Sequence, residues 1–391
     1  KPSSAASDVY KRQGQTRSFG TYFNAFPASY WRRWTRVRDV TLTVATKGEG
    51  RIVVHRSSAN GRSRTVVTET VAGEAVSTFT LPVTAFGDGG WYWFDVHSSA
   101  GALEVSGATY SAPESLARVR GSFSIAMTTM NKVRYCFENI RTIANSPRLF
   151  ELLDVMYIID QGSDRLRDHA DELAELEKAM GDKLRVIEQG NIGGSGGFSR
   201  GMYEACIAEK STYVVNCDDD ISIEPISLER LVTFADFATK PTLVGAHMFD
   251  LNNRTSMLAF GESIDRWRFH YGLAFSDSKY NHDLAVHPLR ATSWMHRRVD
   301  VDYNGWWMCL IPTEVVREIG LSLPVFIKWD DAEYGLRAGN AGFPTVTLPG
   351  AGVWHMSWSE KDDLVGWQAF FHERNRLITC LFYTSPSPRD S

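Results

Sequence analysis

Residues 213–224 read YVVNCDDDISIE, an apolar, strand-like run that ends in three consecutive carboxylates. Like charges packed together repel, so such a cluster is kept where water, a cation or a nearby base offsets the repulsion. Side chains alternate between the two faces of a strand, so Asp218 and Asp220 should point the same way and Asp219 the other way. Two carboxylates on one face suit Mg²⁺ or Mn²⁺ bridging a diphosphate. The alternative is a solvated acidic turn.

Around this stretch, apolar strands alternate with segments of helical length. From Phe123 onward FSIAMTT, LDVMYIID, KLRVIEQ and YVVNC are separated by segments such as HADELAELEKAM. This alternation predicts a Rossmann-like α/β domain with a mainly parallel sheet, whose ligands gather at the carboxyl ends of the strands. The strand ends TTMNK (128–132) and IDQGSDR (159–165) bring polar groups to that edge, where a base and ribose could bind. Ordinary loop polarity explains them equally well.

Residues 21–112 follow a different pattern. VTLTVAT, RIVVHR, TVVTET, VSTFTL, WYWFDV and LEVSGATY have period two and are separated by Gly, Asp and Ser turns. Such strands predict an all-β sandwich or jelly-roll-like domain. We expect this domain to span residues 14–115 and the α/β domain to span 116–382, because the polar ends 1–13 and 383–391 look like non-native additions.

Composition narrows the classes of function. The 391 residues are 43% hydrophobic, enough for two or three domains, and their net charge of -4 lacks the positive field that non-specific nucleic-acid binding needs. The five cysteines include no CxxC pair, which argues against a zinc knuckle or a disulfide framework and fits a reducing cytosol. No apolar run approaches the ~18 residues of a membrane span. We therefore expect a cytoplasmic globular protein without a nucleic-acid partner.

The stretch NIGGSGGFSRG (191–201) holds four glycines in five positions. A helix is expected to begin after Phe198, so that the glycine-rich backbone before it passes close to a ligand and its free amides face an anion. The stretch is neither a P-loop, since GK[ST] is absent, nor a spaced GxGxxG. The alternative is a flexible surface loop.

Four other stretches each allow a structural and a functional interpretation. In KWDDAEYGLRAG, Asp330 and Asp331 precede a short helix and could simply cap it. A lone histidine such as His355 in GVWHMSW is more often structural than a ligand. The indoles of NGWWM either fill the core or offer flat faces to sugar C–H groups. The run WRRWTRVR (31–38) is expected to form an exposed strand face, with contact to anionic lipid heads as the alternative.

Together these stretches resemble the GT-A glycosyltransferases of family 2, and more closely the polymerising galactofuranosyltransferases of actinobacterial cell-wall galactan synthesis. TYFNAFPASYW, NIGGSGGFSRG, CDDDISIEP, NGWWMCLIP, WDDAEYGLR, VWHMSW and FFHERNR carry the resemblance, which spans about residues 21–377. The family more usually has an aromatic residue and an arginine where this chain reads TMNK, so Met130 and Lys132 would hold the nucleotide differently. The family also continues into a C-terminal helical extension, and we expect this chain to be truncated before it.

The resemblance implies roles for particular residues. Asp331 would be the catalytic base, with Asp330 beside it holding the acceptor. Asp218, Asp220 and His355 would bind the metal cofactor, Mn²⁺ or Mg²⁺. The other implied contacts are Trp306, Trp307 and His372 with the acceptor, and Thr129, Lys132, Gln161, Asn191, Gly194 and Asp219 with the nucleotide sugar.

The implied function is an inverting, metal-dependent transfer of galactofuranose from UDP-galactofuranose to a hydroxyl of a growing, lipid-linked galactan. Such an enzyme would work in the cytoplasm. Peripheral contact with the inner face of the plasma membrane and assembly into a homo-oligomer are both compatible with the resemblance. Three alternatives stay open: an initiating transferase of the same fold, a phosphohydrolase that uses the first aspartate of Asp-x-Asp, and a non-catalytic carbohydrate-binding protein. The phosphohydrolase is disfavoured because at least three predicted strands precede the Asp-x-Asp pair.

Overall fold

The computed structural model describes residues 14–356 and 365–384, and the chain divides into two compact units. The β unit runs to Val119 and also contains Asp236–Thr239 and His282–Val299, while the α/β unit contains the rest of the chain from Arg120. The sequence predicted one boundary, after residue 115, and nothing in it indicated the two short segments that join the β unit. Of the ends expected to be non-native, 1–13 and 383–391, only residues 383 and 384 are among the described residues.

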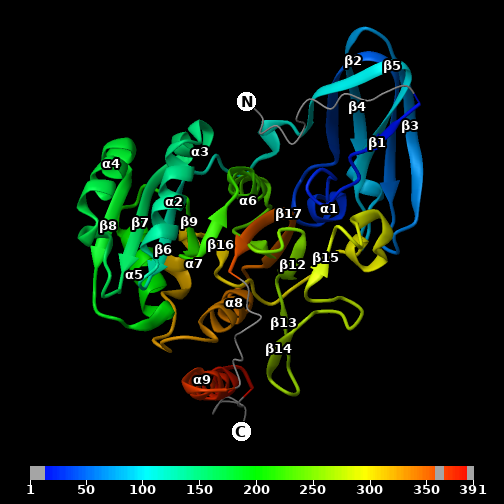
Figure 1. Ribbon diagram of the computed structural model, residues 1–391. Helices are drawn as coiled ribbons and strands as arrows, with labels where there is room; N and C mark the ends of the chain where they lie inside the picture. Colours follow the sequence, from blue (N-terminus) through cyan, green and yellow to red (C-terminus); the bar gives the residue numbers. More distant parts are fainter. Residues whose placement is uncertain (1–13, 357–364, 385–391) are drawn as a thin grey trace. The chain divides into compact units, whose positions relative to one another are not determined.

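The β unit is built on an antiparallel sheet, as the period-two pattern predicted. Its two long strands, β2 (Asp39–Ser57) and β5 (Tyr92–Ser111), pair along most of their length. β1 (Thr16–Ser18) pairs with β5, and β2 pairs on its other edge first with β4 (Glu74–Pro82) and then with β3 (Ser63–Val71) (Figure 1). The strand order is therefore β1-β5-β2-β3, with β4 beside β2.

Two glycines allow the long strands to change register. The pairing of β2 with β5 shifts around Gly48 and Gly50. A β-carbon at Gly48 would lie 2.2 Å from the carbonyl oxygen of Ala102, and one at Gly50 would lie 2.2 Å from that of His97. Only glycine fits where the backbones come this close.

Helix α1 (Ala28–Trp34) shows that one expectation was wrong. Residues 31–34 of the WRRWTRVR run belong to this helix and not to an exposed strand. The Trp31 and Phe26 ring centroids are 5.6 Å apart, so this indole packs inward. The period-two interpretation failed because Trp31 and Trp34 are also three residues apart, which is a helical spacing. The remaining elements of the β unit are η1 (Val83–Ala85), η2 (Glu114–Leu116), β15 (His282–Asp283), η5 (Leu289–Ala291) and η6 (Ser293–His296).

The sheet of the α/β unit has a parallel half and a mixed half. In the parallel half the order is β8 (Leu184–Glu188), β7 (Leu153–Asp160), β6 (Phe123–Thr129) and β9 (Tyr213–Asp218). This is the strand–helix alternation that the sequence predicted. Because all four strands run the same way, their carboxyl ends lie at one edge.

The mixed half follows β9. β16 (Met308–Pro312) runs antiparallel to both β9 and β11 (Leu243–Asp250), and β17 (Thr345–His355) runs parallel to β11. β10 (Ile221–Ile223) and β12 (Ser256–Ala259) add antiparallel pairs to β17 and β11, and β13 (Ser263–Asp265) with β14 (His270–Gly272) forms a separate hairpin. The reversal of β16 brings Met308 beside Cys217, so the residues just before β16 lie next to the end of β9.

Two groups of helices accompany this sheet. Helices α2, α3 and α4 form the first group, and α5, α7 and α8 form the second (Figure 1). Among the described residues, no helix combines the length and the apolar character needed to cross a membrane. The helices of the α/β unit are α2 (Val133–Ala144), α3 (Pro147–Leu152), η3 (Leu166–Asp168), α4 (Ala170–Met180), η4 (Gly181–Lys183), α5 (Gly193–Ile207), α6 (Pro225–Phe237), α7 (Thr313–Ile319), α8 (Asp330–Asn340) and α9 (Trp367–Thr384).

Candidate active site

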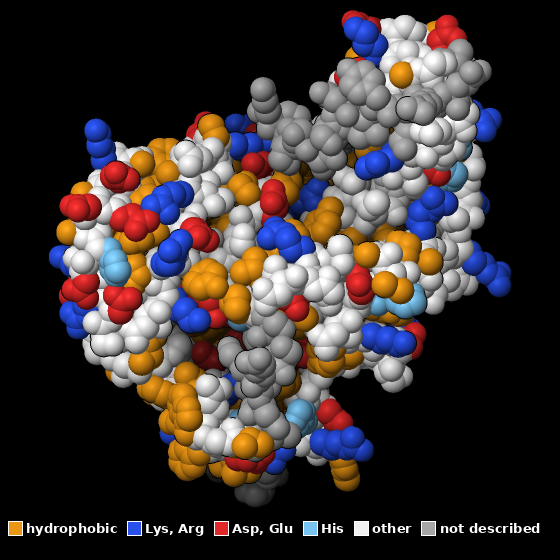
Figure 2. Space-filling view, viewed as in Figure 1, with side chains coloured by type: hydrophobic (Ala, Val, Ile, Leu, Met, Phe, Trp, Pro, Cys, Tyr) orange, Lys and Arg blue, Asp and Glu red, His pale blue; other side chains and the backbone are white. Residues whose placement is uncertain are grey.

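A cavity of about 460 Å³ opens in the α/β unit at the carboxyl end of β9. This is the edge of the sheet at which the sequence predicted the ligands to gather. Figure 2 shows acidic side chains recessed in a hollow in the lower half of the view. The cavity is lined by Gly194, Phe198, Asp218, Asp219, Asp220, Ala259, Glu262, Tyr271, Tyr303, Trp306, Trp307, Ile327, Lys328, Trp329, Asp330, Asp331, His355 and Gln368.

Asp218, Asp220 and His355 meet in this cavity. β10 pairs with the end of β17 so that Ile221 lies opposite His355. As a result, His355 Nε2 lies 3.0 Å from Asp220 Oδ1 and 3.4 Å from Asp218 Oδ2. Asp219 turns away, and its Oδ2 accepts a hydrogen bond from the Met130 N–H at 3.1 Å. The alternation predicted for the three carboxylates is confirmed.

The electrostatics of this group favour a cation between the carboxylates. Burial lowers the pKa of His355, but hydrogen bonds and charge attraction from Asp218 and Asp220 outweigh burial and raise this pKa to about 10. The imidazolium thus supplies the positive charge that offsets the carboxylates. In this arrangement, no group of three or more His, Cys, Asp or Glu side chains within the described ranges could hold a metal ion.

The donor types nevertheless fit a divalent metal. Carboxylate oxygens are the ligands that Mg²⁺ and Mn²⁺ prefer. His355 Nδ1 is 2.6 Å from the carbonyl oxygen of Met356 and donates to it, so the neutral ring leaves its lone pair on Nε2. Metal binding would therefore require the loss of one proton from His355 and a small separation of the three side chains. Their role as metal ligands stays a prediction.

Thr129, Lys132 and Asp219 lie together at the ends of β6 and β9. Lys132 Nζ is 3.8 Å from Asp220 Oδ2. Burial raises the pKa of Asp219 to about 6, although the hydrogen bond from the Met130 N–H opposes this shift. The predicted nucleotide-side residues therefore neighbour the metal-ligand candidates. Their contact with a nucleotide stays a prediction.

The glycine-rich stretch corrects another expectation. Helix α5 begins at Gly193 and not after Phe198, so the glycines form its first turns. A β-carbon at Gly197 would lie 2.1 Å from Thr128 Cγ2, and one at Gly201 would lie 2.4 Å from Ala126 Cβ. Glycine thus allows α5 to pack directly on β6, which overrides its weak helix propensity. The surface-loop alternative is wrong, while Gly194 does line the cavity at the helix N-terminus.

Gln161 and Asn191 hold the start of α5. Gln161 Oε1 accepts the Ile192 N–H at 2.9 Å, and its Nε2 donates to the Gly193 carbonyl oxygen at 3.0 Å. Asn191 Oδ1 accepts the Gly193 N–H at 3.0 Å. Both side chains thus fix the helix N-terminus that faces the cavity, and neither is part of the cavity lining described above.

Asp330 and Asp331 form the first turn of α8, and both line the cavity. Trp329 is the N-cap residue, and it makes no side-chain capping bond. Asp331 Oδ1 accepts the N–H of the adjacent Ala332 at 2.7 Å. Neither aspartate is therefore the N-cap residue, although Asp331 satisfies one N–H of the first turn and negative charge there suits the helix dipole.

The segment before α8 has an unusual backbone. Phe326, Lys328 and Trp329 have φ values of 77°, 65° and 69°. Such left-handed residues raise the energy of the fold unless the surroundings hold them. Asn375 on α9 provides this support, because its Nδ2 lies 3.1, 2.6 and 2.9 Å from the carbonyl oxygens of Val325, Ile327 and Lys328.

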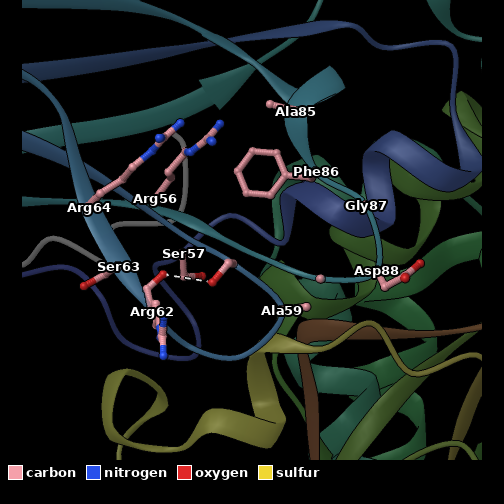
Figure 3. A pocket seen from close by; sticks show the side chains of 12 residues that line it. Arg56, Ser57, Ala59, Arg62, Ser63, Arg64, Ala85, Phe86, Gly87 and Asp88 are labelled. Carbon is pink, nitrogen blue, oxygen red and sulfur yellow. Dashed lines mark hydrogen bonds between the residues drawn. The ribbon is translucent and has the colours of Figure 1, made fainter.

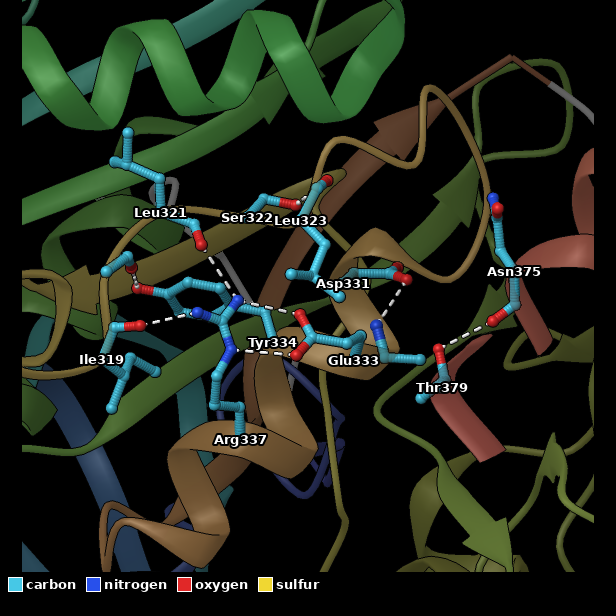
Figure 4. A network of polar contacts seen from close by, with 12 residues as sticks. Ile319, Leu321, Ser322, Leu323, Asp331, Glu333, Tyr334, Arg337, Asn375 and Thr379 are labelled. Carbon is cyan, nitrogen blue, oxygen red and sulfur yellow. Dashed lines mark hydrogen bonds and ion pairs between the residues drawn. The ribbon is translucent and has the colours of Figure 1, made fainter. Parts of the chain in front are cut away.

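A network of hydrogen bonds around Arg337 holds helix α8 itself. Arg337 donates to both carboxylate oxygens of Glu333, at 2.9 and 2.8 Å, and to the carbonyl oxygens of Ile319 and Leu321, at 2.6 and 2.9 Å. Figure 4 shows this network beside Asp331, with Asn375 and Thr379 on the neighbouring helix. The backbone that carries the two aspartates is therefore fixed from both sides.

Burial and mutual repulsion disfavour negative charge on this pair. The pKa of Asp330 is raised to about 6, chiefly by burial and also by Asp218. The pKa of Asp331 is raised well above 3.8 by burial and then by Asp330. A carboxyl with a raised pKa is a better proton acceptor once it is ionised.

Trp306 and Trp307 are largely buried, with 5% and 7% of their surface exposed. Trp306 belongs to the hydrophobic core of the α/β unit and packs on Phe198, with ring centroids 5.2 Å apart. Trp307 Nε1 donates to the Ala246 carbonyl oxygen at 2.7 Å. Both indoles nonetheless line the cavity, so they combine the core role with a small face that could meet an acceptor.

His372 lies behind the cavity wall. Trp329 Nε1 donates to His372 Nδ1 at 3.4 Å, so the neutral ring carries its proton on Nε2, which is 3.0 Å from the Tyr271 hydroxyl. The ring is only 2% exposed. His372 therefore orients Tyr271 and Trp329, two residues of the lining. The ring itself does not line the cavity, so this placement does not provide the predicted direct contact with the acceptor.

Sequence reasoning missed Glu262, Tyr271 and Tyr303, which also line the cavity. Glu262 accepts hydrogen bonds from the hydroxyls of Tyr280 and Tyr303, and burial raises its pKa. These residues come from the largely irregular stretch between β12 and β16, where neither a strand nor a helix period marks a side chain as inward-facing. No local pattern of the sequence would have singled them out.

The Rossmann-like half-sheet and the acidic cavity at its carboxyl edge define a glycosyltransferase domain of the GT-A fold. The chain belongs to the family described as "Glycosyltransferase like family 2", whose model matches residues 120–379. A second model, described as "Galactofuranosyltransferase 2 N-terminal", matches residues 4–113.

Two curated relatives and one solved structure are similar to parts of this chain. The chain is 44% identical over 375 residues to galactofuranosyltransferase GlfT2 of Mycolicibacterium smegmatis, covering 94% of this chain and 57% of the relative. It is 42% identical to the GlfT2 of Mycobacterium tuberculosis, again over 375 residues, covering 94% of this chain and 58% of that protein. The chain thus spans less than two thirds of both relatives. A solved structure of the mannosyltransferase PcManGT from Pyrobaculum calidifontis in complex with GDP-Man and Mn²⁺ gives a TM-score of 0.46 at 12% identity, covering 69% of this chain and 67% of that chain.

Proposed function

We propose that this protein transfers galactofuranose from UDP-galactofuranose to a hydroxyl of a galactan acceptor, with inversion at the anomeric carbon. The observation that carries the proposal is that two sets of residues line one cavity of about 460 Å³: Asp218, Asp220 and His355, and the pair Asp330 and Asp331. A transferase needs both, because the departing diphosphate and the proton of the attacking hydroxyl must each be stabilised. Both curated relatives are named galactofuranosyltransferases, which supports the choice of sugar.

Each group in the cavity has a part in this reaction. Asp331 accepts the proton of the acceptor hydroxyl while the hydroxyl oxygen bonds to the anomeric carbon, on the face opposite UDP. The bond from that carbon to the diphosphate breaks, and its electron pair leaves with UDP. The positive end of the α5 dipole, at Gly194 in the cavity lining, favours the negative diphosphate. Mn²⁺ or Mg²⁺ held by Asp218, Asp220 and His355 would supply Lewis-acid stabilisation of the diphosphate charge.

We propose a lipid-linked galactan as the acceptor, so the enzyme would act in the cytoplasm at the inner face of the plasma membrane. Asp330 holds the acceptor hydroxyl near Asp331, and the exposed faces of Trp306 and Trp307 lie against sugar C–H groups. The position of β9 argues against a phosphohydrolase that uses Asp218 as nucleophile. Three strands of the α/β unit precede β9 in the chain, whereas such enzymes carry that aspartate after the first strand.

The test is incubation of the protein with UDP-galactofuranose, Mn²⁺ and short galactofuranosyl acceptors, with mass spectrometry and linkage analysis of the products. We expect chain extension that excess chelator abolishes. Asp218→Asn should abolish transfer and Asp182→Asn, on the exposed η4 turn, should not. Release of phosphate without an elongated product, or full transfer in chelator, would overturn the transferase or the metal proposal respectively.

A further inference from the structure

A second cavity, of about 320 Å³, lies in the β unit and is rich in arginine. Its wall is formed by the end of β2, the β2–β3 turn, the start of β3 and the loop 85–89. Arg56, Arg62 and Arg64 all line it. Neither the family resemblance nor the proposed reaction involves any of these residues.

Two of these arginines oppose one another across the sheet. In the register of β2 with β3, Arg56 lies directly opposite Arg64. Like charges in this position repel and destabilise the strand pair. Figure 3 shows the two side chains running alongside each other, while Arg62 points another way. Like-charged neighbours of this kind are stabilised when an anion binds between them.

No carboxylate supplies that anion within the residues that the structure describes. None of the ion pairs found there includes Arg56, Arg62 or Arg64. Asp88, the acidic residue of the lining, has a side chain 92% exposed and lies 3.9 Å from Arg298 Nη2. In Figure 3 the Asp88 carboxylate points away from Arg56 and Arg64. The positive charge of the pair is therefore not balanced by the lining.

The neighbours of Arg56 hold its guanidinium in place. Its central carbon is 5.7 Å from the centroid of the Phe86 ring. Burial raises the pKa of the neighbouring Tyr92 phenol, and the charges of Arg56 and Arg64 oppose this shift, while the Tyr92 hydroxyl donates to the Pro82 carbonyl oxygen at 2.9 Å. A guanidinium fixed over an aromatic ring presents its planar fork of N–H donors, and that fork matches two oxygens of a phosphate group.

We propose that Arg56 and Arg64 form a binding site for a phosphate group, either a lipid phosphate headgroup or a soluble phosphate or diphosphate. A purely structural role is the competing explanation. β3 is an edge strand, and charge on an edge strand discourages pairing with other chains. That role needs no ligand, so binding measurements separate the two explanations.

The experiment compares the full chain with the double variant Arg56→Gln, Arg64→Gln. Arg51→Gln is the matched control, because Arg51 is an exposed arginine of β2 outside the cavity lining. Calorimetry with inorganic pyrophosphate, at constant ionic strength, measures the soluble ligand. Sedimentation with phosphatidic acid vesicles, against phosphatidylcholine vesicles, measures the lipid headgroup.

We expect the double variant to lose about tenfold or more in affinity, since each charge-assisted bond to phosphate is worth roughly that factor. Without ligand it should melt no lower than the unmodified protein, because repulsion is relieved. Selective loss of pyrophosphate binding supports a soluble ligand, and selective loss of phosphatidic acid binding supports a lipid. Binding of neither probe by the unmodified protein, or equal losses in Arg51→Gln, would overturn the site. Galactofuranosyl transfer to short acceptors should be unchanged in all these variants, so this test is independent of the proposed reaction.

Discussion

Replacing Asp331 by Asn removes one negative charge and keeps the size of the side chain. An amide oxygen can still accept the Ala332 N–H that Asp331 Oδ1 accepts at 2.7 Å, so the start of α8 should persist. A neutral amide cannot take up the proton of the acceptor hydroxyl. If Asp331 is the base, transfer should fall by roughly 10²–10⁴-fold, or about 2.7–5.4 kcal/mol of activation free energy.

The same substitution should not lower stability. Burial and Asp330 raise the pKa of Asp331 well above 3.8, so the folded protein binds this proton more tightly than the unfolded chain does. The ionised side chain therefore lowers the free energy of unfolding progressively as pH rises from about 4 through the folded-state pKa. Removal of the charge should leave the melting temperature at pH 7 unchanged or raise it.

The assay is the initial rate of galactofuranosyl transfer at saturating acceptor, with UDP binding followed by calorimetry in the presence of Mn²⁺. Asp330→Asn should lose less activity if this neighbour only holds the acceptor, and Asp182→Asn on the exposed η4 turn serves as the surface control. Near-normal transfer by Asp331→Asn would refute the assignment. A loss of transfer accompanied by a large fall in melting temperature would point to a structural role instead.

Three further predictions follow from the packing and charge of the α/β unit. Gly197→Ala should destabilise the protein by roughly 1–3 kcal/mol in urea unfolding, because its β-carbon would lie 2.1 Å from Thr128 Cγ2; unchanged stability would mean that α5 can shift. Trp307→Ala should lower the free energy of unfolding by roughly 3–5 kcal/mol and raise KM for the acceptor. An unchanged melting temperature would contradict the core role of this indole. Transfer should decline as pH falls through the raised pKa of Asp331, with UDP binding measured alongside; a rate independent of pH on the acid side would contradict its role as base.

The sequence by itself determined the features that depend on local periodicity. Alternation along a strand predicted that Asp218 and Asp220 face one way and Asp219 the other, and the distances to His355 bear this out. The alternation of strands with helical segments predicted the parallel half of the sheet, and period two predicted the antiparallel β unit. Family resemblance, and not periodicity, singled out Asp331 and His355.

Tertiary packing decided the rest, because it depends on contacts between residues far apart in the chain. The glycines of residues 193–197 indicate a loop when only the local sequence is considered. They lie in a helix because α5 packs closely on β6, where a side chain would not fit. The antiparallel β16 and the parallel β17 could not be ordered from local pattern, since strand pairing is set by long-range burial. Glu262 and Tyr303 reach the cavity from irregular backbone, and Tyr271 from the three-residue strand β14, which is too short to show a period. For His372, only the fold shows that its ring lies behind Tyr271 and Trp329, where hydrogen bonds to both fix its position.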